Sequence, residues 1–98
     1  MTDADILTIL QADLNILAPD ATRTAQMEQY IAAAKEFIKR EGVDLTTPYS
    51  IEDGQLIEMY AAYLFRKRDS DTGMPRMLRW ALNNRIFSRK ESDSDAAG

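Results

Sequence analysis

The chain has 98 residues, 45% of them hydrophobic, and a formal net charge of −4, which fits one small globular domain with a compact core. It contains neither cysteine nor histidine, so disulfides, thiolate chemistry, the commonest nucleophile–base pairs and most zinc sites are excluded. The N-terminus opens acidic and no apolar run is long enough to span a bilayer, so neither a signal peptide nor a membrane segment is predicted.

The first predicted helix begins after Thr2 and ends near residue 14. Thr2 can cap it, because Asp5 stands three residues later in the position of a capping box. Pro19 disfavours helical geometry in the residue before it, so residues 15–20 are expected to form a connection. The apolar stripe of this helix is Ile6, Leu10 and Leu14.

The second predicted helix begins between residues 22 and 24 and runs to Glu41. Gly42 follows it and can adopt the left-handed conformation that commonly ends a helix. Residues 43–49 contain Pro48 and are predicted to be a loop. The core stripe of the second helix is Met27, Ile31, Ala34 and Ile38.

The third predicted helix contains the most apolar stretch of the chain, residues 56–65, in which Glu58 is the only charged residue. Ser50 and Asp53 repeat the capping pattern at its start. A helix that is apolar on nearly all sides is a buried helix. It is therefore expected either to be the centre of a small bundle or to be partly covered by a neighbouring subunit.

The fourth predicted helix starts near Pro75 and ends at about Phe87. Its apolar stripe is Met74, Leu78, Leu82 and Ile86. Residues 69–73 are predicted to be a turn and not a calcium loop, because Trp80 stands where a bidentate glutamate is needed. Residues 89–98 are acidic and lack large apolar side chains, which is typical of a disordered tail.

The sequence therefore predicts an all-α fold, a small bundle of about four helices with a buried third helix. Residues 1–88 are expected to form the folded domain and residues 89–98 the disordered acidic tail. The predicted core includes Leu10, Ile31, Ile38, Ile57, Ala61, Leu64 and Leu78.

The charges are unevenly distributed along the chain. Residues 66–90 carry eight basic and two acidic residues, whereas residues 1–65 carry eleven acidic and four basic ones. On the fourth helix, Arg76, Arg79 and Arg85 surround Trp80, a composition typical of protein-binding surfaces. Two other interpretations stay open: a nucleic-acid-binding helix, or a core tryptophan with merely solvated arginines. The candidate assembly interface is Arg76, Arg79, Trp80 and Arg85, together with Tyr60 and Tyr63.

Paired carboxylates are the only other groups that could carry chemistry. Glu52 with Asp53 stands at a predicted helix N-terminus, and Asp69 with Asp71 stands in a predicted turn, positions where acidic residues are common for structural reasons. No phosphate-binding loop, metal-ligand cluster or nucleophile elbow is present in the sequence. We therefore expect neither an enzyme nor a cofactor.

Three stretches of the sequence resemble the head-tail connector family of long-tailed phages and prophages. They are Tyr30–Ile38, Tyr60–Arg68 and Gly73–Arg85, the last reading Gly-Met-Pro-Arg-Met-Leu-Arg-Trp-Ala-Leu-Asn-Asn-Arg. The resemblance covers about residues 3–88.

This resemblance implies a structural head-completion protein with no catalytic residues. Such an adaptor forms a ring, typically of twelve copies, beneath the portal protein and offers a surface to the next neck or tail-completion protein. The implied location is the neck of the virion, after synthesis in the bacterial host cytoplasm. DNA passes through the ring without sequence-specific binding and no membrane is involved. The alternative function is a small helical DNA-binding or regulatory module that uses the basic fourth helix.

Overall fold

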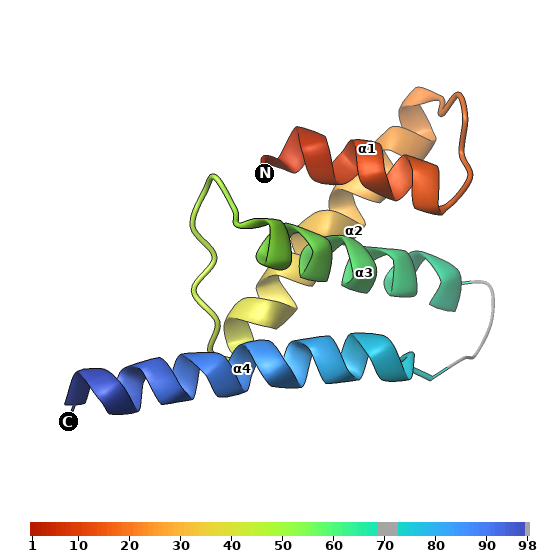
Figure 1. Ribbon diagram of the computed structural model, residues 1–98. Helices are drawn as coiled ribbons and strands as arrows, with labels where there is room; N and C mark the ends of the chain where they lie inside the picture. The colour runs from red at the N-terminus through yellow and green to blue at the C-terminus, as the bar shows by residue number, and fades with distance from the viewer. Residues whose placement is uncertain (69–72, 98) are drawn as a thin grey trace.

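The computed structural model describes residues 1–68 and 73–97, with side chains described as far as residue 88. These residues form four helices and no strand, α1 (Asp3–Asp13), α2 (Ala21–Arg40), α3 (Ile51–Lys67) and α4 (Arg76–Ala97). Figure 1 shows α3 between α1 and α4, with α2 crossing it obliquely. The all-α fold with a central third helix is therefore confirmed.

The helix starts follow from the capping residues. Thr2 Oγ1 accepts a hydrogen bond from the Asp5 N–H at 3.3 Å, and the Thr2 N–H donates to the Asp5 carboxylate at 2.9 Å. These bonds lower the pKa of Asp5. α2 begins at Ala21, slightly earlier than predicted, because Asp20 caps it by accepting from the Arg23 N–H at 2.8 Å.

The loop before α3 is fixed to the N-terminus of the chain. The terminal ammonium of Met1 donates to the Tyr49 carbonyl, and the Tyr49 N–H donates to the Met1 carbonyl, both at 2.7 Å. The Met1 side chain lies directly against Gly54, where an added Cβ would collide with it. The glycine in the first turn of α3 thus makes room for Met1. Gly42 ends α2 with a φ of 97°, as predicted.

The core is centred on α3, whose middle is buried by the other helices of the same chain. Leu64 is a correction to the predicted core, because it is only partly buried. It lies with Tyr63 and Phe65 in the last turns of α3, where the helix leaves the core. The buried apolar side chains include the other six predicted residues, Leu10, Ile31, Ile38, Ile57, Ala61 and Leu78.

α4 packs on α3 through Leu78 and Leu82, both fully buried. The Pro75 carbonyl accepts from the Arg79 N–H at 3.1 Å, which closes the first turn. The helix continues to Ala97, so the predicted end near Phe87 is corrected. The division of the chain into a folded domain and a disordered tail at residue 89 stays a prediction. No proline or glycine interrupts the sequence before Gly98, and nothing in the backbone stops the helix earlier. Most of the predicted turn at 69–73 lies outside the described residues.

Candidate assembly interface

The outward face of α4 carries large apolar side chains. Met77, Trp80 and Phe87 are 73%, 67% and 61% exposed and lie on the face opposite the buried Leu78 and Leu82. A tryptophan this exposed does not anchor a core, so the interpretation of Trp80 as a core residue is wrong. A cluster of exposed large apolar residues on one face is typical of a binding surface.

Basic and polar side chains surround Trp80 on this face. A shallow hollow of about 520 Å³ is lined by Met74, Arg76, Arg79, Trp80 and Asn83. Arg76 and Arg79 are both exposed and have no ion-pair partner among the described residues. The structure therefore brings together three of the six candidate residues, Arg76, Arg79 and Trp80. We call them, with Met77 and Phe87, the α4 face.

Arg85 lies elsewhere, on the inner side of α4. Its Nε donates to Asp53 Oδ1 at 2.7 Å and its second guanidinium nitrogen to Oδ2 at 3.3 Å, in a forked ion pair. Asp53 is buried in the first turn of α3 and raises the pKa of Arg85. Arg85 therefore forms an ion pair between α4 and α3 and is not part of the exposed surface around Arg76 and Arg79. The pairing also gives Asp53 a structural role.

The two candidate tyrosines pack against other aromatic side chains of the bundle. Tyr60 is buried and stacks on Phe37, with ring centroids 4.5 Å apart, and Tyr63 meets it edge-on at 5.7 Å. Burial raises the pKa of Tyr60, while the positive charge of Arg79 acts in the opposite direction. Tyr60 and Tyr63 are thus part of the aromatic layer between the helices, and only Tyr63 is partly exposed.

A buried carboxyl group that the sequence did not identify as a site lies where α1 meets α3. Arg66 donates to Asp13 Oδ1 at 3.2 Å and to the Asp13 carbonyl at 3.3 Å. Glu58 is only 6% exposed and is hydrogen-bonded to the Asp13 carboxylate. Burial and the Asp13 charge raise the pKa of Glu58 to about 8, while this contact and Arg66 lower the pKa of Asp13. At neutral pH Glu58 therefore stays protonated, and its O–H donates a hydrogen bond to the Asp13 carboxylate.

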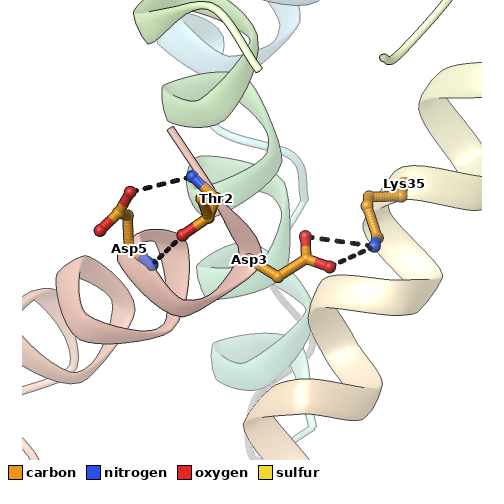
Figure 2. A network of polar contacts seen from close by, with 4 residues as sticks. All are labelled: Thr2, Asp3, Asp5 and Lys35. Carbon is orange, nitrogen blue, oxygen red and sulfur yellow. Dashed lines mark hydrogen bonds and ion pairs between the residues drawn. The ribbon is translucent and has the colours of Figure 1, made fainter. Parts of the chain in front are cut away.

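A second hollow, of about 350 Å³, lies between α1 and α2. At its edge the Lys35 ammonium pairs with the Asp3 carboxylate at 3.1 Å, next to the capping box of α1 (Figure 2). Burial acts to lower the pKa of Lys35, but the contacts with Asp3 and Tyr49 outweigh it and raise the pKa. Four of the seven residues that line the hollow are small or apolar, and the other three are charged.

Within the described part of the chain, no cluster of three or more potential ligands is placed to hold a metal ion. In the same residues, no helix has both the length and the apolar character needed to cross a membrane. Searches for a matching family model, a related curated protein or a similar solved structure find no match to this chain.

Proposed function

We propose that this protein is a head-tail connector, a structural adaptor that forms a ring beneath the portal of a long-tailed phage or prophage. The ring extends the DNA channel and links the capsid to the next neck or tail component. The proposal starts from the resemblance of three sequence stretches to this family. The observation that supports it best is the α4 face, on which the exposed Trp80 lies beside Arg76 and Arg79.

The composition of this face favours a protein partner. Tryptophan and arginine are the residues that most often dominate the binding energy of protein interfaces. Leaving Trp80 and its apolar neighbours in water is unfavourable, and covering them with a partner would recover about 25 cal/mol for each Å² of apolar surface buried. The rest of the chain is strongly acidic, so neighbouring copies offer the arginines complementary charge.

The same net acidity suits a channel protein. DNA must move through the ring, and a negatively charged subunit disfavours tight contacts with phosphate groups. The alternative is a DNA-binding module, which is supported by the position of Arg76, Arg79 and Asn83 on one exposed surface.

The test is a charge reversal on the α4 face, Arg76→Glu with Arg79→Glu. Arg23→Glu with Arg40→Glu is the matched control, because both residues are exposed on α2 and the change in net charge is the same. Circular dichroism checks folding, sedimentation velocity measures ring formation, and binding to DNA-filled capsids that carry the portal measures docking. Fluorescence anisotropy measures binding to duplex DNA at low salt.

We expect the α4 variant to fold and to lose ring formation or docking, while the control retains both. A folded α4 variant that assembles and docks like the unmodified protein would show that another surface makes the ring, and an unmodified chain that neither assembles nor docks would overturn the adaptor proposal. If the unmodified chain forms no ring and the α4 variant loses duplex binding that the control keeps, the DNA-binding alternative takes its place.

A further inference from the structure

The hollow between α1 and α2 has room for one large side chain. Ala4, Leu7, Ile31 and Ala32 line it, and the two exposed alanines leave the space that longer side chains would fill. Its volume of about 350 Å³ falls in the range of clefts that enclose compact apolar groups. We call this hollow the α1–α2 groove.

The rim of the groove is acidic. Asp3 and Lys35 neutralise each other in their ion pair, whose two members Figure 2 shows facing one another from α1 and α2. Glu28 also lines the groove and has no ion-pair partner among the described residues. The charge that remains available to a partner is therefore negative.

The α4 face has the complementary composition. Trp80 supplies a large, flat apolar group, and Arg76 and Arg79 lie within one turn of it on the N-terminal side. A tryptophan that enters an apolar hollow, with arginines reaching an acidic rim, is the arrangement found at the centre of tight interfaces.

The two surfaces cannot meet within one chain. α4 lies on the opposite side of α3 from α1, as Figure 1 shows, and α4 packs mainly on α3. Each copy therefore presents one α4 face and one α1–α2 groove, pointing to different neighbours. A contact between two different patches is heterologous, and it builds a ring when the rotation closes.

We propose that the α4 face of one copy docks into the α1–α2 groove of the next copy, with the Trp80 indole seated between Ala4 and Ala32. This inference rests on the proposed ring function and names the contact that forms the ring. Pairing two α4 faces with each other is less favourable, because Arg76 and Arg79 of both copies would then be brought together.

The experiment blocks each half of the contact separately. Trp80→Ala removes the inserted side chain, and Ala32→Trp fills the groove at an exposed position of α2. Leu17→Ala is the matched control, because it removes an apolar side chain that is 91% exposed in the α1–α2 connection. Sedimentation velocity and cross-linking on portal-bearing capsids measure self-association of each variant alone and of equimolar mixtures.

We expect Trp80→Ala and Ala32→Trp each to weaken self-association by at least about tenfold, and Leu17→Ala to leave it unchanged. A mixture of the two blocked variants should give heterodimers, because one partner keeps its groove and the other keeps its α4 face. A charge exchange in one chain, Glu28→Lys with Arg79→Glu, should associate more tightly than either single change. This second measurement covers the case in which Ala32→Trp does not fold.

Normal assembly of folded Ala32→Trp, or blocked variants that do not pair in the mixture, would overturn the inference. If those variants still form rings and dock, the proposed function stands and another surface makes the ring. If the unmodified chain stays monomeric both in solution and on portal-bearing capsids, the inference and the proposed function fail together.

Discussion

Replacing Glu58 by glutamine is expected to remove most of the pH dependence of the protein's stability above about pH 5. Glu58 is buried where α1 meets α3, and it is held in its protonated form by burial and by the neighbouring Asp13 carboxylate. The amide of the Glu58→Gln variant can donate to Asp13 as the protonated carboxyl does, but it cannot ionise.

The direction in which stability changes with pH follows from the protonation of Glu58 in the folded and unfolded chains. The pKa of Glu58 is about 8 in the folded chain against an ordinary value of 4.5, so between these values the folded chain holds a proton that the unfolded chain has released. The stability that the protonated Glu58 contributes to the folded chain is therefore complete below pH 4.5 and is lost as the pH rises toward 8. The loss is about 1.4 kcal/mol per pH unit, or about 2–3 kcal/mol between about pH 5 and 7.

Ionisation of Asp13 has the opposite effect on the stability of the chain, and it does so at lower pH. Its pKa lies below the ordinary value of 3.8, so its contribution is lost as the pH falls below that value. We therefore expect maximal stability of the unmodified chain at mildly acidic pH, between the two transitions.

The assay is urea denaturation followed by circular dichroism at several pH values from about 5 to 8. Glu36→Gln is the control, because Glu36 is an exposed acidic residue of α2 and its removal changes the net charge equally. We expect a nearly flat profile for Glu58→Gln, greater stability than the unmodified chain at the alkaline end, and an unchanged slope for Glu36→Gln. Parallel profiles for Glu58→Gln and the unmodified chain would refute a buried, protonated Glu58.

Three further predictions concern the helix contacts, each measured as the free energy of unfolding. Leu82→Ala should cost about 2–5 kcal/mol because Leu82 is fully buried, and Leu64→Ala should cost less because Leu64 is only partly buried; equal losses would contradict this order. Gly54→Ala should fail to give the gain of about 1 kcal/mol that alanine brings to a helix, since its Cβ would displace the Met1 side chain. Arg85→Ala should cost about 1–3 kcal/mol by leaving a buried carboxylate unpaired, and a loss no greater than that of the exposed Arg76→Ala would show the ion pair to be unimportant.

The helices were predictable because their signals are local. Apolar periodicity and a capping residue identify α1 and α3, and Gly42 marks the end of α2. α2 begins earlier than the predicted start between residues 22 and 24 because Asp20 supplies its cap. The end of α4 was missed because loss of apolar residues does not stop a helix when no proline or glycine interrupts it.

The candidate site was only half predictable. The spacing of Leu78, Leu82 and Arg85 places all three on the inner side of α4, and Trp80 on the outer side, so helical periodicity was enough to predict these two faces. It could not predict the contact partners: Arg85 contacts a carboxylate of α3, and Glu58 contacts a carboxylate of α1. Contacts between helices far apart in the sequence leave no periodic signal in either helix.

Residues 66–90 carry eight basic side chains, and several of these already have contacts within the chain. Arg66 and Arg85 are held in ion pairs with carboxylates of the same chain, while Lys67 and Arg68 lie over the rings of Tyr63 and Phe65 at 5.6 and 5.3 Å. Among the residues of α4 up to Ser88, whose side chains are described, Arg76 and Arg79 are the basic side chains that remain for an intermolecular contact. Affinity for DNA grows with the number of phosphates neutralised, and these two arginines by themselves supply little of it. The same two arginines beside an exposed tryptophan are sufficient for the centre of a protein interface, where packing of the aromatic group provides most of the binding energy.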